Sequence, residues 1–303
     1  MEHCSVVVLS YNSQETINET LNSILEQGKR NVEVIISDDA SQDNSISLIK
    51  DWVSKNALMF DYRPKLIASD ENLGIAGNLK EGVSHASCEW VKVLAGDDLL
   101  ASNALETYMS FIRNEPQKHH VIFANVQEFF GNIHSLGKVF PESIDKKKFN
   151  LDAREQFEAL KFHCFPAAPS CFFNKKIIHD FGAFSSDYGI EDYPTWLSLT
   201  KQGVTLGYID EVLVYYRRDF GSITVGDKLI SKFLLAQKKS VYRNIISPEN
   251  SNFVVKAHHR ICFFVDDLIV FLGNKKNLSF LMYLKNLSPF ILMRKVSKVV
   301  NNV

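Results

Sequence analysis

Two adjacent carboxylates, Asp97 and Asp98, follow an apolar run that ends at Ala95. Neighbouring negative charges repel each other unless a cation binds, so a turn or a helix cap alone does not account for the pair. Clustered oxygen ligands suit Mg²⁺ or Mn²⁺ that is held jointly with a substrate diphosphate. The pair therefore predicts a divalent-metal site for a ligand that carries phosphates.

Polar residues also follow the first and second apolar runs of the chain. The segment 10–12 comes directly after the first run, and the acidic segment 38–43 follows the second. Ligands of open α/β sheets bind beyond the carboxyl ends of the strands, so these two segments and the carboxylate pair are expected to meet in one crevice.

The usual glycine-based phosphate sites are absent from the sequence. No G-x-G-x-x-G motif and no P-loop follows the first apolar run, residues 5–9. Both motifs cradle phosphates on backbone N–H groups. A bound metal is therefore expected to manage the phosphates here.

Strands and helices alternate through the first hundred residues, and this alternation would position the polar clusters. Asn12 is expected to cap the first helix, with Glu15 three residues on as in a capping box. The pattern predicts an α/β fold with a mostly parallel sheet and helices on both faces. The predicted strands are residues 5–9, 32–37, 64–68 and 90–95, with helices after each.

The pattern loosens after residue 120. Residues 131–152 are polar and are expected to form a mobile loop, and a helix is expected at 193–201. Further strands are predicted at 121–125, 167–173, 205–209 and 212–216.

Bulk properties narrow the class of protein. The 303 residues carry a net charge of −1, which gives no general indication of nucleic-acid binding. The 5 cysteines show no C-x-x-C spacing and are expected to be reduced, mostly buried thiols of a cytoplasmic protein. Neither a secretory signal nor a transmembrane helix is expected, because no apolar run is long enough.

Several short motifs, in one order along the chain, resemble family 2 bacterial glycosyltransferases, which have the GT-A fold and build O-antigen or other surface polysaccharides. GT-A is a Rossmann-like, mostly parallel sheet flanked by helices. The resemblance covers about residues 5–225. The matching segments are 6–12, 35–43, 71–78, 94–98 and 191–196, with a weaker match at 215–218.

The resemblance implies a UDP-sugar donor. Tyr11 would lie against the uracil ring, and Asp39 would accept the uracil N3–H hydrogen bond, which cytidine cannot donate. Asp97 would bind the ribose, and Asp98 would hold the Mn²⁺ or Mg²⁺ that offsets charge on the UDP leaving group. The other donor-binding residues implied are Ser10, Asn12, Glu15, Asn72, Asn78 and Gly96.

The acidic pair Glu191–Asp192 resembles the catalytic pair of the family. Asp192 would be the general base that deprotonates the acceptor hydroxyl, with inversion at the anomeric carbon. The alternative is that Asp192 caps the following helix. Trp196 is a secondary acceptor-binding candidate, and packing in the core is its competing interpretation.

Arg217 and Arg218 follow a strand and are candidates to bind a diphosphate, with solvated surface charge as the alternative. Two departures from the family pattern bear on this part of the site. The His expected near the metal is missing, since Arg218 and Asp219 occupy its region, which leaves open whether Asp219 completes the metal shell. Gly77 stands where many relatives carry a basic residue.

The resemblance divides the chain into a catalytic domain, residues 1–225, and a C-terminal helical region, residues 226–303. Within the first, residues 1–100 would bind the nucleotide and 101–225 the acceptor. The C-terminal region mixes apolar and basic residues, which is typical of helices that lie on an anionic membrane surface. A homodimer interface, or packing on the catalytic domain, is the alternative.

The expected function is transfer of a hexose or N-acetylhexosamine from a UDP-sugar to a saccharide hydroxyl, on an acceptor linked to a polyprenyl diphosphate. This would take place in the cytoplasm or at the inner face of the cell membrane. A degenerate UDP-sugar-binding domain and a sugar nucleotidyltransferase are the alternatives. The second would need a glycine-rich loop with a basic residue after the first strand, and residues 10–13 do not match.

Overall fold

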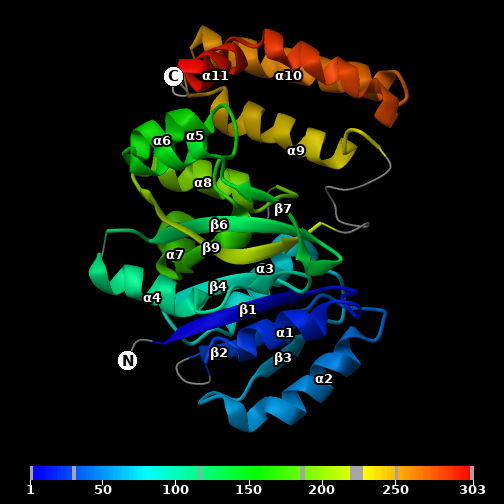
Figure 1. Cartoon of the computed structure of the whole chain (residues 1–303), viewed down its shortest axis with the longest axis vertical. Helices are drawn as coiled ribbons and strands as arrows, with labels where there is room; N and C mark the ends of the chain where they lie inside the picture. The colour runs from blue at the N-terminus through cyan, green and yellow to red at the C-terminus, as the bar shows by residue number, and fades with distance from the viewer. Residues whose placement is uncertain are drawn as a thin grey trace. The chain divides into compact units, whose positions relative to one another are not determined.

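A nine-stranded sheet lies at the centre of the larger part of the chain (Figure 1). The computed structural model describes residues 3–28, 32–115, 118–184, 188–218, 228–249 and 252–300. The strand order is β3-β2-β1-β4-β8-β6-β9-β5, and β7 pairs with β6. The strands are β1 Cys4–Ser10, β2 Val32–Asp38, β3 Lys65–Ala68, β4 Trp90–Ala95, β5 Leu99–Leu100, β6 Val121–Phe130, β7 Asn132–Phe140, β8 Phe172–Asn174 and β9 Leu206–Arg217.

The first four strands are parallel, as the sequence predicts. β1 pairs with β2 on one side and with β4 on the other, and β3 extends the sheet beyond β2. Val6, Val7 and Val8 have no exposed surface, because helices cover both faces of β1. β-Branched residues suit a strand that is buried on both faces.

Helices flank the sheet on both faces. Helices α1, α2 and α4 contribute Leu21, Ile49 and Leu105 to the same core cluster as Val6 and Val8. α3 packs against β1 and β2 from the face on which Val7 lies. The helices of this part are α1 Ile17–Leu25, α2 Ser45–Asn56, α3 Gly74–Ser84, α4 Ala104–Asn114, α5 Ser143–Lys146, α6 Ala153–Leu160, α7 Lys176–Phe181 and α8 Asp192–Lys201, with 3-10 turns η1 Ala57–Met59, η2 Lys147–Asn150 and η3 Ala168–Ser170.

The second half of the sheet is mixed. The short strand β8 runs antiparallel to both β4 and β6, whereas β9 runs parallel to β6. The strands predicted at 205–209 and 212–216 are one strand, β9, with a register shift where it passes Asn125. Asp210 and Glu211 are exposed at this shift, so a polar interruption in the sequence is a bulge and not a strand end.

The prediction of a mobile loop at 131–152 is wrong. Gly131 turns the chain, and β7 then pairs antiparallel with β6, followed by α5 and η2. β7 is an edge strand with mostly exposed side chains, so it lacks the alternation that marks a half-buried strand. Phe149 is buried and stacks on Tyr208 at 4.6 Å between ring centroids.

The N-terminal cap predicted for the first helix is also wrong. The cap residue of α1 is Thr16, and no side chain caps this helix. Asn12 instead has a positive φ of 49° and bonds to the loop after β2. The strand predicted at 167–173 is the turn η3 followed by β8, since Pro166 and Pro169 have no N–H to donate to a sheet.

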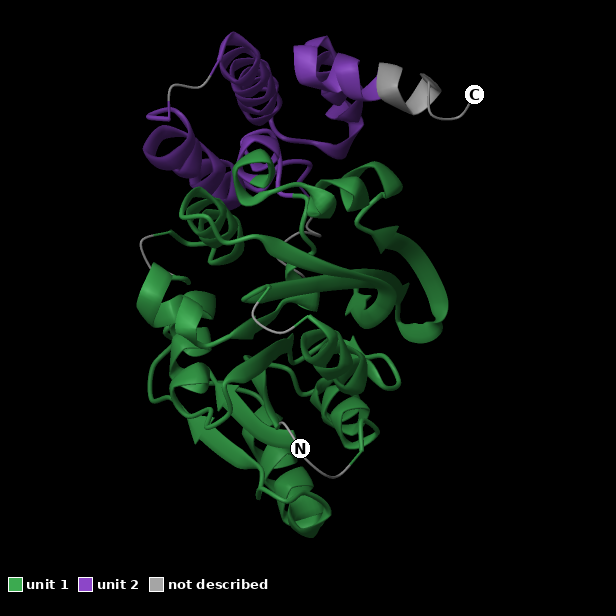
Figure 2. Cartoon of the chain, turned by 90° about the vertical axis from the view of Figure 1, so that its left-hand side faces the viewer, with its two compact units in different colours: residues 1–156, 165–217 green, residues 157–164, 218–303 purple. Residues whose placement is uncertain are grey.

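The chain forms two compact units (Figure 2). Unit 1 comprises residues 1–156 and 165–217, and unit 2 comprises residues 157–164 and 218–303. Unit 2 is helical: α9 Lys232–Val241, the π-helical turn η4 Tyr242–Ile246, α10 Phe253–Phe271, the 3-10 segment η5 Lys276–Leu287 and α11 Pro289–Val300. Among the described helices, none combines the length and the apolar character needed to cross a membrane.

Two buried histidines connect the pieces of unit 2. His258 on α10 accepts from the Ser288 hydroxyl at 2.7 Å and donates to the Phe162 carbonyl at 3.0 Å. His259 bonds to the Lys161 carbonyl at 2.6 Å. Burial, together with the neighbouring His259, lowers the pKa of His258 to about 4, so this histidine is neutral at physiological pH.

Gly82→Ala is expected to destabilise unit 1. An added Cβ would lie 2.5 Å from Cγ1 of Val7 and 3.0 Å from Cβ of Ser37, and a buried valine on β1 has little freedom to move away. Overpacking costs about 1–3 kcal/mol, whereas alanine in place of glycine gains roughly 1 kcal/mol of helix propensity. Urea unfolding should show a net loss of stability. Ser84→Ala in the same helix is the control, and an equal or higher stability of Gly82→Ala would contradict the close packing.

Candidate functional site

The carboxyl ends of β1, β2 and β4 meet at one edge of the sheet. The Asp39 N–H donates to the Ser10 carbonyl at 2.9 Å, and the Gly96 N–H donates to the Leu9 carbonyl at 2.8 Å. β9 runs in the same direction and brings Arg217 to this edge. The three polar clusters predicted from the sequence therefore lie on adjoining loops, at what we call the carboxyl edge.

The loop after β1 is held by the loop after β2. The Asn12 N–H donates to Ser41 Oγ at 2.8 Å, and Asn12 Oδ1 accepts from the Gln42 N–H at 2.8 Å. Ser10 Oγ donates to buried Asp38 at 2.8 Å. These bonds leave Tyr11 half exposed, at 50%, on a fixed loop, which is the arrangement that a ring-stacking residue needs. Glu15 is exposed nearby in sequence.

Asp39 ties the loop after β3 to the carboxyl edge. Its two carboxylate oxygens accept from the N–H groups of Leu73 and Gly74, at 2.6 and 3.0 Å, at the start of α3. Asn72 Oδ1 also accepts from the Gly74 N–H. A carboxylate offers about four lone-pair sites, so each Asp39 oxygen retains capacity for one more donor.

Asn78 is buried between α3 and β2. Its amide nitrogen donates to the Ser37 carbonyl at 3.1 Å, whereas its Oδ1 is buried with no hydrogen-bond partner. The side chain therefore holds α3 to β2, the strand that ends at Asp38. A donor contact for Asn78 stays a prediction.

Asp98 is a deeply buried carboxylate of the carboxyl edge, with 1% of its surface exposed. Its Oδ1 accepts from the Arg217 N–H at 3.1 Å. Burial raises the pKa of Asp98 well above its usual range, and the negative charge of the neighbouring Asp97 raises it further. Gly96 is required just before the pair, since a Cβ there would lie 3.1 Å from the Leu9 carbonyl.

Arg217 joins four segments at this edge. Its guanidinium donates to the backbone carbonyls of Asp97 and Gly131, each at 2.9 Å, pairs with Glu19 on α1 and lies over the Phe129 ring. Only 5% of its surface is exposed, so the interpretation as solvated surface charge is wrong for Arg217. The guanidinium orients the turn that carries Asp98. Arg218 is partly buried, and Asp219 lies outside the described residues.

Lys92 is a buried charge that the sequence analysis missed. It lies in the middle of β4 with no exposed surface, and its Nζ donates to the Pro169 carbonyl at 2.6 Å. Burial lowers the pKa of Lys92 to about 8, while Cys171 and Asp98 oppose this effect. A single lysine inside an otherwise apolar strand was the available signal. Lys92 fixes the segment that leads into β8 and adds positive charge behind Asp98.

The predicted catalytic pair lies where α8 begins. Glu191 is the N-cap residue of α8, and Asp192 is the first helical residue, with its Oδ1 accepting from the Tyr193 N–H at 2.6 Å. Burial and the charge of Asp192 raise the pKa of Glu191 to about 7. Burial raises the pKa of Cys171; the charge of Lys92 opposes this effect, and the charge of Asp192 adds to it. Asp192 and Lys92 therefore both lie close enough to Cys171 for their charges to act on it.

The acceptor-binding prediction for Trp196 is wrong. The indole is 1% exposed, and Phe123 and Phe184 pack edge-on against it at 4.9 and 5.9 Å. Stacking on a sugar needs one whole accessible ring face, and Trp196 has none. The tryptophan instead anchors α8 to β6 and thereby positions Glu191 and Asp192.

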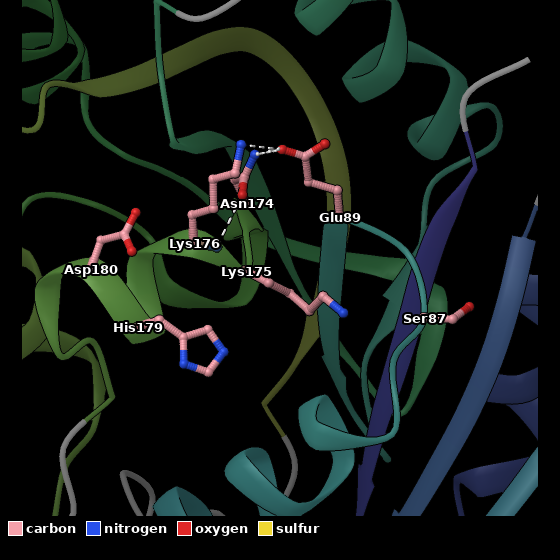
Figure 3. A pocket seen from close by; sticks show the side chains of 7 residues that line it. All are labelled: Ser87, Glu89, Asn174, Lys175, Lys176, His179 and Asp180. Atoms are coloured by element: carbon pink, nitrogen blue, oxygen red, sulfur yellow. Dashed lines mark hydrogen bonds and ion pairs between the residues drawn. The ribbon is translucent and has the colours of Figure 1, made fainter.

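A solvent-open pocket of about 340 Å³ lies at the other end of β4 (Figure 3). Glu89, just before β4, bonds to Asn174 at 2.8 Å and pairs with Lys176 at 3.1 Å across this pocket. Asp97 and Asp98 follow β4, so the pocket and the carboxyl edge are at opposite ends of the strand. The chemistry predicted from the sequence therefore does not belong to this pocket. It is lined by Ser87, Glu89, Asn174, Lys175, Lys176, His179 and Asp180.

The carboxyl edge fits a divalent cation that is shared with a diphosphate. A buried carboxylate with a raised pKa, next to a second carboxylate, gains most from a neighbouring positive charge. Within the described ranges, no group of three or more His, Cys, Asp or Glu side chains could hold a metal by itself. Mg²⁺ commonly takes only one or two carboxylates and completes its shell with phosphates and water, so Asp98 with a diphosphate would suffice.

Comparison with known proteins decides the family. The model described as "Glycosyl transferase family 2" matches residues 5–180. The chain belongs to glycosyl transferase family 2. The matched span includes the loops of the carboxyl edge that follow β1, β2 and β4. It ends before Glu191, Asp192 and Arg217.

Curated relatives of the chain are named as glycosyltransferases. The chain is 24% identical to the UDP-Glc:alpha-D-GlcNAc-diphosphoundecaprenol beta-1,3-glucosyltransferase WfaP of Escherichia coli, over 87% of this chain and 92% of WfaP. It is 33% identical to the putative glycosyltransferase EpsE of Bacillus subtilis (strain 168) over 118 residues. That match covers 39% of this chain and 40% of EpsE, less than half of either.

Solved structures of glycosyltransferases share the fold. Residues 1–349 of TarS from S. aureus, in complex with UDP-GlcNAc, align with a TM-score of 0.55 and 17% identity, over 87% of this chain and 72% of that one. The mannosyltransferase PcManGT from Pyrobaculum calidifontis, in complex with GDP-Man and Mn²⁺, aligns with a TM-score of 0.54 and 17% identity, over 99% and 74%. The family 2 chain therefore has the expected GT-A fold, a mixed sheet flanked by helices, with a helical C-terminal region.

Asp98→Asn is expected to stabilise the protein in the absence of metal. The folded-state pKa of Asp98 is raised, so folding retains a proton there, and stability falls as pH rises above the ordinary carboxyl pKa of about 4. An amide removes that pH-dependent penalty. At pH 8 with EDTA, the melting temperature of Asp98→Asn should exceed that of the wild type by at least about 2 °C. A lower melting temperature of Asp98→Asn would contradict the destabilising effect of the buried charge. Asp61→Asn, on the exposed loop before β3, is the control.

Proposed function

We propose that the chain transfers a hexose or N-acetylhexosamine from a UDP-sugar to a hydroxyl of a saccharide on a polyprenyl diphosphate lipid. The transfer inverts the anomeric carbon and requires Mn²⁺ or Mg²⁺. The observation that carries the proposal is the buried Asp98 carboxylate beside Asp97, at the same edge as Tyr11 and Asp39. We propose residues 1–225 as the catalytic region and residues 226–303 as the helical extension, although residues 157–164 and 218–225 belong to the compact helical unit.

The choice of uridine rests on Tyr11 and Asp39. Tyr11 offers a half-exposed ring on a fixed loop, and Asp39 is held by two backbone amides with further acceptor capacity. An acceptor at that place favours the protonated N3 of uracil over the unprotonated N3 of cytosine. Asp97 is proposed to bind the ribose, and Ser10, Asn12, Glu15, Asn72, Asn78 and Gly96 remain proposed members of the donor site.

The proposed reaction is a single displacement. Asp192 accepts the proton of the acceptor hydroxyl as its oxygen forms a bond to the anomeric carbon. The bond from that carbon to the β-phosphate oxygen breaks, and UDP leaves with the electron pair. When bound, the cation at Asp98 would offset the negative charge of the diphosphate. Burial and the charge of Asp192 raise the pKa of the neighbouring Glu191 to about 7, so the charge of Glu191 changes near neutral pH.

The acceptor class is drawn from two relatives. WfaP and WfgD of Escherichia coli are both named as transferring glucose to GlcNAc-diphosphoundecaprenol. WfgD is 25% identical over 65% of this chain. The proposed location is therefore the inner face of the cell membrane. Arg218 is a proposed contact of a diphosphate, whereas the guanidinium of Arg217 is buried and bonded within the protein, so the diphosphate contact predicted for Arg217 is not retained. The family assignment argues against a sugar nucleotidyltransferase. A degenerate domain would bind UDP-sugar without transferring the sugar, so a measurement of turnover distinguishes it from an active enzyme.

UDP with Mn²⁺ should raise the melting temperature. A ligand at about 100 times its Kd adds roughly 2.7 kcal/mol of stability, which corresponds to several degrees. EDTA should abolish the shift, and CDP with Mn²⁺ should produce a smaller one. If no uridine nucleotide shifts the melting temperature, the proposed UDP-sugar donor is wrong. If the shift persists in EDTA, only the proposed metal requirement is wrong.

Asp192→Asn should retain the UDP-dependent shift and lose turnover by about 100-fold or more, because a positioned base contributes roughly 10²–10⁴-fold. In the wild type, turnover should rise with pH through about 7, as Glu191 ionises. Glu191→Gln should lose that rise. Release of UDP from a panel of UDP-sugars measures both variants, with Asp180→Asn as control. Turnover of Asp192→Asn near the wild-type value would exclude Asp192 as the base.

A further inference from the structure

Three exposed phenylalanines lie on the outer face of α10. Phe253, Phe264 and Phe271 are 80%, 64% and 85% exposed. Residues at these spacings, 11 and 7 positions apart, share one side of an α-helix, because 3.6 residues make one turn. Lys256 and Arg260 are also exposed and occupy the same side. The outer face of α10 thus carries three aromatic and two cationic side chains, together with Asp267, which is exposed on the same side.

The inner face of α10 already supplies the core of unit 2. Val255, Val265 and Ile269 are buried there, together with the two histidines that bond to residues 161 and 162. The three phenylalanines are therefore not needed to pack this helix. Exposed aromatic side chains that gather on one face are unusual in a soluble protein and mark a binding surface.

The segment after α10 continues the same chemistry. Lys275 and Lys276 are exposed directly after the helix, and Phe280 and Tyr283 on η5 are 60% and 75% exposed. The two acidic residues of α10 are neutralised by lysines: Asp267 pairs with Lys239 at 2.5 Å, and Asp266 pairs with Lys285 at 2.6 Å. The cations on the outer face therefore keep their charge for a partner.

The charge of the chain is divided unevenly. Residues 218–303 contain 14 of the 34 lysines and arginines but only 5 of the 35 acidic residues, although the whole chain has a net charge of −1. An excess of positive charge in one region attracts an anionic partner. It also opposes a symmetric dimer through the same face, because a two-fold interface would bring identical cations together.

We propose that the outer face of α10 and Lys275–Lys276 bind an anionic lipid bilayer surface, with Phe264 and Phe271 inserted among the headgroups and the cations paired with lipid phosphates. Aromatic side chains with interleaved lysine and arginine are the composition that binds such a surface. The surface extends the proposed function, because it holds the enzyme where a polyprenyl-linked acceptor is found. Vesicle binding requires no turnover, so it fails or succeeds independently of glycosyl transfer.

The test is sedimentation of the full chain with vesicles. One set consists of phosphatidylcholine, and the other contains about one third phosphatidylglycerol. The wild type should bind the anionic vesicles more tightly, and added salt should weaken this binding. Phe264→Ser/Phe271→Ser should lower the partition coefficient by about tenfold or more. Its control is Leu58→Ser in unit 1, where the leucine is 99% exposed.

A charge reversal tests the cations separately. Lys275→Glu/Lys276→Glu should also lower the partition coefficient about tenfold or more, since each lysine near an anionic surface contributes roughly fivefold. Lys50→Glu/Lys55→Glu on α2 changes the net charge equally and should lower it by less than about twofold. All variants should retain the wild-type circular dichroism and the UDP-dependent melting shift, which shows that unit 1 is intact.

Three results would overturn the proposal. The first is equal binding of the wild type to neutral and anionic vesicles, or no binding to either. The second is a loss in the α2 control as large as that in the Lys275–Lys276 variant. The third is concentration-dependent dimerisation of the wild type that Phe264→Ser/Phe271→Ser removes, which would make the outer face of α10 a contact between two copies.

Discussion

The carboxylate of Asp98 is buried at the end of β4, and the Arg217 backbone N–H and the adjoining turn hold it there. A charged group in such a place is costly unless a positive charge approaches it. The guanidinium of Arg217 donates to the carbonyls of Asp97 and Gly131 and pairs with Glu19. Among the contacts described, Arg217 therefore fixes the turn without a side-chain hydrogen bond to Asp98. The loop thus stays in place while the carboxylate remains available for a cation.

The parallel half of the fold could be predicted because its strands are mostly apolar and end in polar segments. Residues 4–10, 32–38 and 90–95 have this pattern, and their carboxyl ends do adjoin. The second half could not be read in the same way. β7 is an exposed edge strand that resembles a loop in sequence, and β9 is interrupted by Asp210 and Glu211 at a bulge. Periodicity identifies a strand only where one face is buried and the pairing is regular.

Short motifs predicted where the candidate site residues lie relative to the sheet, but they did not predict how deeply each side chain is buried. The motifs placed Asp39 and Asp98 correctly at the carboxyl edge, yet they could not show that Trp196 is enclosed by Phe123 and Phe184. The role of Lys92 depends on a carbonyl 77 positions away, that of Pro169. Partners of that kind are set by tertiary packing, and one sequence alone does not reveal them.

Residues 157–164 lie between two segments of unit 1 in the chain, yet they belong to unit 2, where Phe162 stacks on Phe290 at 4.3 Å and its carbonyl accepts from His258. The C-terminal helices therefore complete a core whose other portion is contributed by the middle of the chain. A shortened chain that ends near residue 225 would leave that portion without its cover, with Phe162 and two backbone carbonyls open to water. The amino-terminal part of the enzyme is thus not separable by one cut, and insolubility of such a fragment would report the missing cover rather than a defect of the catalytic sheet.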